Sequence, residues 1–262
     1  MSILDKIVGR KKEEIEWNRK RVPASRLESS AYYKRECLSL KKALTRRGAS
    51  GIIAEFKRRS PSKGVLNGEA DLIATVSGYE LAGASAISVL TDVDFFGGSN
   101  ENLQKSRAAV HIPILRKDFI IDEYQVMEAK AIGADVILLI ASVLSTFETE
   151  KLARFAHSLG LEVLLEIHHE QELGHVNSFV DVVGINNRNL NDFTTDVQTS
   201  FLLGAQLPAS SVKISESAIS RPEVILQLKE AGFSGFLIGE TFMKEADPAK
   251  ACQDFIKALN AL

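Results

Sequence analysis

The feature that most constrains the fold is a regular alternation of short apolar runs and amphipathic stretches, which begins at Ile52. Eight runs rich in Val, Ile and Leu follow one another, at 52–56, 86–90, 112–116, 135–140, 162–167, 182–186, 212–215 and 235–238. Amphipathic stretches separate several of them, at 71–81, 122–131, 146–159, 199–207 and 221–231. Continuous apolar strands that alternate with helices are typical of a parallel sheet covered by helices.

Eight such units between residues 52 and 262 predict a closed (β/α)8 barrel, the TIM-barrel fold of the α/β class. Glycines that precede several strands support this prediction, because helices often end on a left-handed residue. These glycines are Gly83, Gly133, Gly160 and Gly232. A doubly wound open sheet is the alternative, which is disfavoured because no GxGxxG segment follows the first strand.

Residues 1–50 have a different pattern from the rest of the chain. Apolar residues recur there at helical spacing, at Ile3, Leu4, Ile7, Val8 and Ile15. Such a stripe needs a surface to cover. No linker or low-complexity segment divides the chain, so we predict one domain, 1–262, in which residues 1–50 form a helical extension packed on the barrel.

Composition narrows the classes of partner and compartment. The formal net charge of −2 argues against nucleic acid or an anionic membrane surface as a partner. No apolar run approaches the length of a membrane span. Cys37 and Cys252 lie far apart without metal-ligand spacing, which favours a reduced, cytoplasmic protein without a metal. We expect a monomer that acts on a small molecule.

In a barrel of this kind, chemistry takes place where the strands end. Polar residues follow seven of the eight expected strands, whereas the run 135–140 ends in an apolar wall that includes Leu138. Two lysines and three glutamates form the charged set: Lys57, Lys117, Glu55, Glu166 and Glu216. The lysines can bind an anion or donate a proton, and the glutamates can pair with them.

The remaining strand-end residues indicate what the site binds. Arg188 can hold a carboxylate or a phosphate through two parallel hydrogen bonds. Ser217 and Gly239 lie where the last two strands lead into helices, the usual phosphate position of this fold. A slot for a flat apolar ring can be formed by Phe96, Phe119, Leu138 and Leu190. The sequence therefore predicts an anionic, phosphorylated substrate with an aromatic part.

Structural interpretations of the same residues remain open. The pairs Lys57–Glu55 and Lys117–Glu166 can also be ion pairs that stabilise the barrel mouth. His168 and His169 have no partner at metal-ligand spacing and are expected to be structural. Asp118 points opposite to Lys117 on a strand, so we expect it to cap or to pack outside the barrel. No Gly-x-Ser-x-Gly segment is present, which argues against a nucleophilic hydrolase.

Six segments together resemble indole-3-glycerol-phosphate synthases. In chain order they read IIAEFKRRSPSKG, ILRKDFII, LLEIHHEQEL, VGINNRNL, KISESAI and LIGETFM. The resemblance covers nearly the whole chain and implies a (β/α)8 barrel of tryptophan biosynthesis. It implies that 1-(2-carboxyphenylamino)-1-deoxy-D-ribulose 5-phosphate is converted to indole-3-glycerol phosphate, carbon dioxide and water, with no cofactor or metal.

The resemblance also implies roles for individual residues. Lys117 resembles the general acid of ring closure, and Glu166 with Lys57 resembles the pair that serves the later dehydration, with Glu55 as their partner. Asn186 and Glu216 resemble the contacts to the ribulose hydroxyls, and Arg188 resembles the contact to the carboxylate. The phosphate site would comprise Ser60, Ser217, Ala218, Gly239 and Glu240.

Two positions in the phosphate site are unusual. The family pattern has a glycine where this chain has Ala218, and a methyl group there can crowd the phosphate or oppose a positive φ. Glu240 is an acid beside a phosphate, so we expect its side chain to point away. A Cβ at Gly239 is expected to enter the space of the phosphate.

Two other functions compete with this one. A phosphosugar isomerase on the same fold, such as phosphoribosylanthranilate isomerase, favours an Asp or Cys acid–base pair, which these strand ends do not offer. A sugar-phosphate sensor without catalysis is disfavoured because Lys57, Lys117 and Glu166 are all present.

Overall fold

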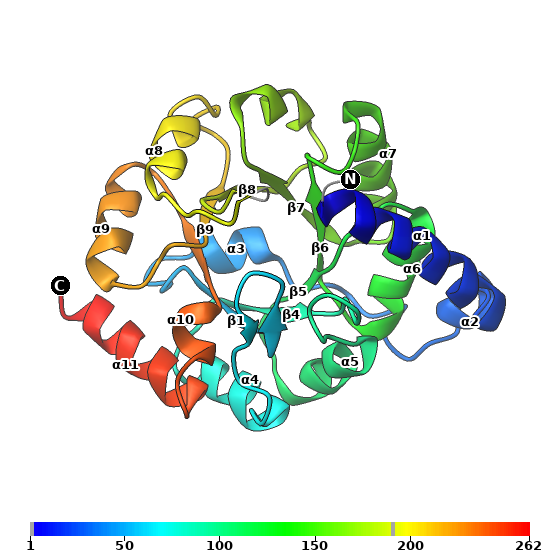
Figure 1. The fold of residues 1–262 in the computed structure, drawn as a ribbon, viewed down its shortest axis with the longest axis horizontal. Helices are drawn as coiled ribbons and strands as arrows, with labels where there is room; N and C mark the ends of the chain where they lie inside the picture. The colour runs from blue at the N-terminus through cyan, green and yellow to red at the C-terminus, as the bar shows by residue number, and fades with distance from the viewer. Residues whose placement is uncertain (1–2, 190–191) are drawn as a thin grey trace.

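The structure is a computed structural model that describes residues 3–189 and 192–262. Eight parallel strands close into a barrel in the order β1-β10-β9-β8-β7-β6-β5-β4, with helices around it (Figure 1). The predicted TIM barrel is therefore confirmed. The strands are β1 (Ile52–Phe56), β4 (Ala86–Leu90), β5 (Ile114–Lys117), β6 (Val136–Ile140), β7 (Glu162–Ile167), β8 (Val182–Asn186), β9 (Lys213–Glu216) and β10 (Gly235–Ile238).

Helices connect successive strands on the outside of the barrel. They are α4 (Leu72–Leu81), α5 (Asn100–Ala109), α6 (Glu123–Ile132), α7 (Thr146–Ser158), the 3-10 helix η1 (Glu170–His175), α8 (Gln198–Gly204), α9 (Pro222–Glu230), α10 (Glu240–Met243) and α11 (Pro248–Asn260). Gly133 ends α6 with a φ of 95°, in agreement with the glycine signal in the sequence. No described helix is long and apolar enough to cross a membrane.

Alternating residues of each strand supply two layers of apolar packing. On β6, Ile137 and Leu139 belong to the layer between strands and helices, whereas Val136, Leu138 and Ile140 belong to the layer inside the barrel. This alternation follows from the two-residue period of a strand. It decides which side chains can reach the mouth of the barrel at the carboxyl ends of the strands.

The N-terminal extension forms α1 (Ile3–Arg21), α2 (Ala24–Glu28) and α3 (Leu40–Thr45). Figure 1 shows α1 and α2 beside α6, and α3 across the barrel. Leu40 and Leu44 of α3 pack with the apolar layer inside the barrel. The backbone N–H of Lys41 donates to Glu162 Oε2 at 2.9 Å, which fixes α3 at the start of β7.

We propose that residues 1–262 form one domain. Besides the packing of α3, Arg35 of the extension pairs with Asp135 beside β6 at 2.7 Å, and the Asp135 side chain is fully buried. Removal of the extension would leave Arg107 as the remaining ion-pair partner of Asp135 among the described residues, and it would uncover the apolar layer against which Leu40 and Leu44 pack.

The domain proposal predicts a single cooperative unfolding transition. Trp17, on α1, is the only tryptophan of the chain and stacks against the Arg21 guanidinium at 4.1 Å. Its fluorescence therefore reports on the extension, whereas far-ultraviolet circular dichroism reports mainly on the barrel. We expect the two midpoints in urea to coincide. An earlier fluorescence midpoint would show that the extension unfolds separately.

Candidate active site

A cavity of about 740 Å3 opens at the carboxyl ends of the barrel strands. The structure brings together at this cavity every predicted site residue that it describes, whereas Leu190 lies outside the described residues. The residues concerned are Glu55, Lys57, Ser60, Phe96, Lys117, Phe119, Leu138, Glu166, Asn186, Arg188, Glu216, Ser217, Ala218, Gly239 and Glu240. The assembly of these side chains from eight strand ends makes the cavity the candidate active site.

Lys117, the last residue of β5, lies at the centre of the charged set. Its Nζ is 2.7 Å from Glu166 Oε2 and 2.6 Å from Glu216 Oε2. Burial alone would lower the pKa of Lys117, but Glu166, Glu216 and Glu55 raise it above its ordinary value. Lys117 therefore presents a permanently protonated ammonium to the cavity.

Glu166, on β7, accepts hydrogen bonds from Lys117 and Asn186 and has a third neighbour, His168. Besides Lys117, Asn186 Nδ2 donates to Glu166 Oε1 at 3.1 Å, and His168 Nε2 lies 3.1 Å from the same oxygen. Burial opposes ionisation, but Lys117 and His168 hold the pKa of Glu166 well below its usual range. Glu166 is consequently a carboxylate at neutral pH, which can accept a proton during turnover.

Glu216, on β9, has a pKa shifted in the opposite direction from that of Glu166, although both side chains contact Lys117. Burial raises the pKa of Glu216 to about 7, against the opposing effect of Lys117. Its Oε1 has no hydrogen-bond partner within the described part of the chain. Glu216 can thus carry a proton near neutral pH and offer a free oxygen to a substrate hydroxyl.

The sequence interpretation of the two histidines was incomplete. His168 is buried and pairs with both Glu166 and Glu172, whereas His169 is exposed. Burial lowers the pKa of His168, but these two carboxylates raise it to about 9. His168 therefore acts on the site through its positive charge, which lies 3.1 Å from Glu166 and lowers the pKa of that carboxyl. No group of His, Cys, Asp and Glu side chains among residues 3–189 and 192–262 has the arrangement of a metal site.

Glu55 and Lys57 form a second ion pair at the end of β1. Lys57 Nζ is 2.6 Å from Glu55 Oε1. Gly239 lies directly against this pair, since a Cβ there would be 2.5 Å from Glu55 Oε1. A Cβ at Gly239 would therefore collide with Glu55 first, and its entry into the phosphate space stays a prediction. Gly239 is required because it faces Glu55.

The turn after β9 adopts the backbone conformation that glycine favours. Ser217 and Ala218 have φ values of 65° and 61°. A left-handed conformation costs a non-glycine residue roughly 1–2 kcal/mol. The departure of Ala218 from the family pattern thus places a strained residue at the predicted phosphate site. The Ala218 methyl group makes the positive φ less favourable, but the backbone adopts this φ nevertheless.

Ala218→Gly should stabilise the protein. The relief of the left-handed strain is partly offset by the greater backbone freedom of glycine in the unfolded chain, so we expect a gain of about 1 kcal/mol in the free energy of unfolding. Urea denaturation measures it. Ala205→Gly is the matched control, because Ala205 has a φ of −69° and should lose stability instead. If Ala218→Gly also lost stability, the inference that Ala218 is strained would be wrong.

Glu240 corrects a second expectation. Its side chain does not point away from the site, because Glu240 Oε2 is 3.1 Å from Arg188 and its Oε1 is 3.6 Å from Lys63 Nζ. All three residues line the cavity. Arg188 thus lies beside the predicted phosphate site, and its guanidinium pairs with the Glu240 carboxylate there.

The residues of the predicted aromatic slot line the cavity after β4, after β5 and on β6. The ring centroids of Phe96 and Phe119 are 6.0 Å apart with 40° between the ring planes, and Leu138 lines the same cavity from β6. Apolar residues of α1, which sequence reasoning assigned only to packing, also line the cavity: Ile3, Leu4 and Ile7. Their helical spacing indicated a buried face but not which surface would cover it.

Comparison with solved structures identifies the architecture. Tryptophan synthase subunit alpha from Legionella pneumophila is 14% identical, with a TM-score of 0.61 over 85% of this chain and 98% of that one. A variant of the tryptophan synthase alpha-subunit from Pyrococcus furiosus is 15% identical, with a TM-score of 0.60 over 82% of this chain and 99% of that one. At such low identity, these similarities show the fold alone.

Sequence comparison identifies the family. The family model for indole-3-glycerol phosphate synthase matches residues 4–255. The indole-3-glycerol phosphate synthase of Bacteroides thetaiotaomicron is 51% identical over 257 residues, which are 98% of each chain. That of Campylobacter jejuni is 42% identical over 254 residues, which are 95% of this chain and 98% of the other. The chain therefore belongs to the indole-3-glycerol phosphate synthase family.

Proposed function

We propose that the cavity converts 1-(2-carboxyphenylamino)-1-deoxy-D-ribulose 5-phosphate to indole-3-glycerol phosphate, carbon dioxide and water. The observation that carries this proposal is the Lys117 ammonium held between Glu166 and Glu216. Phe96 and Phe119 line the cavity from the loops after β4 and β5, and Lys63 and Arg188 line it from the loops after β1 and β8. This combination of groups matches a substrate with an aromatic ring, a keto group and a phosphate.

Ring closure is assigned to Lys117. A ring carbon attacks the keto carbon, and the electron pair of the C=O bond moves onto oxygen. An ammonium beside that oxygen stabilises the developing charge and can protonate it. Because its three neighbouring carboxylates raise the pKa of Lys117, the ammonium is present throughout the neutral pH range.

The later steps need a different pair of groups. Loss of carbon dioxide restores the aromatic ring and needs little help. Dehydration then removes the former keto oxygen as water and a proton from the neighbouring carbon, which requires an acid and a base. We assign the acid to Lys57, which Glu55 holds at 2.6 Å, and the base to the ionised Glu166.

The other lining residues are assigned to substrate binding. Phe96, Phe119 and Leu138 would hold the aromatic ring, as would Leu190, which lies outside the described residues. Asn186 and the free oxygen of Glu216 would bind the hydroxyls. Arg188 would bind an anionic group of the substrate. The phosphate would lie among Ser60, Ser217, Ala218, Gly239 and Glu240, where the backbone N–H groups are the donors.

A turnover assay tests the proposed function. Purified protein is mixed with the carboxyphenylamino substrate, and the indole absorbance of the product is followed. We expect multiple turnovers without added metal or cofactor. Binding of indole-3-glycerol phosphate without turnover would favour a sensor, and conversion of phosphoribosylanthranilate instead would favour the isomerase. Either result would overturn the proposal.

Glu240→Ser should strengthen substrate binding. The Glu240 carboxylate neutralises Arg188 and would repel a phosphate, so its removal should lower KM by about threefold to tenfold, with kcat nearly unchanged. Glu245→Ser is the control, because Glu245 follows α10 outside the cavity lining. An unchanged or higher KM in Glu240→Ser would show that this carboxylate does not oppose phosphate binding.

We also propose that the protein works as a monomer in the cytoplasm. The proposed catalytic groups all come from one chain. Cys37 and Cys252 are both free thiols, as in a reducing compartment. Size-exclusion chromatography with light scattering should give a mass near 28.7 kDa, and twice that mass would contradict the monomer.

A further inference from the structure

Lys11 is a buried cation that the proposed chemistry does not use. It lies on α1, one helical turn after Ile7, and its side chain is only 1% exposed. Its Nζ lies 2.9 Å from Glu14 Oε2, 3.0 Å from Asp92 Oδ2 and 3.0 Å from Asp118 Oδ1. A lysine is rarely buried to this extent unless it is paired. The burial of Lys11 among three carboxylates therefore calls for a structural or functional explanation.

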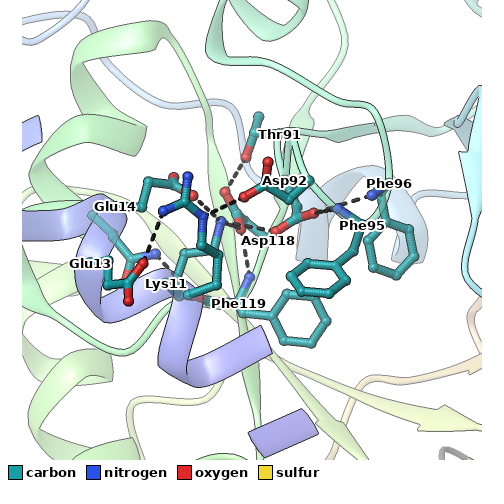
Figure 2. A network of polar contacts seen from close by, with 12 residues as sticks. Lys11, Glu13, Glu14, Thr91, Asp92, Phe95, Phe96, Asp118 and Phe119 are labelled. Atoms are coloured by element: carbon teal, nitrogen blue, oxygen red, sulfur yellow. Dashed lines mark hydrogen bonds and ion pairs between the residues drawn. The ribbon is translucent and has the colours of Figure 1, made fainter. Parts of the chain in front are cut away.

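Asp92 and Asp118 belong to two different strand-end loops. Asp92 follows β4, and its Oδ1 accepts from the backbone N–H groups of Phe95 at 2.8 Å and Phe96 at 3.1 Å. Asp118 follows Lys117, and its Oδ1 accepts from the Phe119 N–H at 2.8 Å. Figure 2 shows both carboxylates between the Lys11 ammonium and the phenylalanines. Asp118 therefore packs outside the barrel, as expected from the sequence, but its partner is the extension.

These contacts form two short paths from one ammonium to the aromatic slot. Each path runs from Lys11 through a carboxylate to the backbone of a slot phenylalanine, Phe96 or Phe119. Asp118 is also held by Thr91 Oγ1 at 2.5 Å, so it is fixed on both sides. Without Lys11, Asp118 would keep Arg116 at 3.3 Å, but Asp92 would be a buried carboxylate without a cationic partner among the ion pairs of the described residues.

We propose that Lys11 is a positioning residue, which sets the separation of Phe96 and Phe119 and thereby the fit of the substrate's aromatic ring. This inference rests on the proposed function for the identity of the ring. Lys11 also anchors α1, whose residues Ile3, Leu4 and Ile7 line the same cavity. The extension thus contributes to substrate recognition through a buried ion cluster.

Kinetic measurements on Lys11→Met test the proposal. We expect KM for the carboxyphenylamino substrate to rise about tenfold and kcat to change less than threefold, because the ring site loosens while Lys117 and Glu166 remain. Inhibition by inorganic phosphate, which probes the other end of the cavity, should be unchanged. Lys12→Met is the matched control, since Lys12 is exposed on the same helix. An equal loss of phosphate inhibition, or an unchanged KM, would overturn the proposal.

Amide hydrogen exchange provides a readout that needs no substrate. In Lys11→Met, the amides of Phe95, Phe96 and Phe119 should exchange faster, whereas the Phe236 amide, bonded to Gly51 at 2.9 Å, should not. Uniformly faster exchange would show a merely structural role and overturn the proposal. Absence of turnover in the unaltered protein would overturn the proposed function and leave this result valid.

A milder variant covers the case in which Lys11→Met does not fold. Asp92→Asn retains the shape of the side chain and an acceptor for Phe95 and Phe96, but it loses the charge that attracts Lys11. We expect KM to rise about threefold, with faster exchange at Phe96 and unchanged phosphate inhibition. Wild-type values for both measurements would overturn the proposal.

Discussion

Lys117→Ala should lower kcat by about two to four decades, the span typical of a positioned acid. The truncation removes the only cation within 3 Å of both Glu166 and Glu216 among the described residues. The negative charge that develops on the keto oxygen would then lie beside the Glu166 carboxylate without a counter-charge. Ring closure, the first step, would therefore slow, and decarboxylation and dehydration would slow with it.

The measurement follows carbon dioxide release and indole absorbance together. Because Lys117 serves the first step, both signals should slow by the same factor in Lys117→Ala. Lys105→Ala is the control, since Lys105 is exposed on α5 and pairs only with Glu101 among the ion pairs of the described residues. Circular dichroism checks that the variant folds. Folded Lys117→Ala with near-wild-type turnover would contradict the assignment.

Glu166→Gln should lower the rate of indole formation by about two to three decades. The amide keeps the size of the side chain but cannot accept the proton that dehydration releases. Ring closure and decarboxylation still have the Lys117 ammonium. Carbon dioxide should therefore appear in a burst that precedes the indole signal, unlike in Lys117→Ala.

Rapid-mixing experiments with one enzyme equivalent of substrate detect this burst. Glu170→Gln is the matched control, because Glu170 is exposed on the adjacent η1 and should release both products at the wild-type rate. Equal slowing of carbon dioxide and indole in Glu166→Gln would place Glu166 in ring closure instead. The two variants together thus separate the first step from the last.

The fold and most of the site could be predicted from the sequence because the signals for them lie in short, continuous segments. A strand and the polar residue at its end are neighbours in the chain, so Lys117, Glu166 and Glu216 could each be assigned to the mouth of the barrel from their own short segments. The closure of parallel strands then brings their carboxyl ends together. The structure agrees, because these three side chains meet within hydrogen-bond distance.

What the sequence did not predict depends on contacts between distant segments. Glu240 was expected to point away, but Arg188, 52 residues earlier, attracts its carboxylate to the cavity. Lys11 meets Asp92 and Asp118 only after α1 packs beside the ends of β4 and β5, and nothing in its local pattern distinguished it from the exposed lysines nearby. Ion pairs of this kind are set by tertiary packing, which periodicity does not reveal.

A crystal structure with indole-3-glycerol phosphate bound tests the central claim most directly, namely that the substrate lies across the mouth with its ring at Phe96 and Phe119. The account predicts the indole ring between these side chains, the former keto carbon beside Lys117, and the phosphate within hydrogen-bond distance of the Ala218 and Glu240 amides. A phosphate beside Phe96 and Phe119, or a product bound outside the cavity, would contradict it.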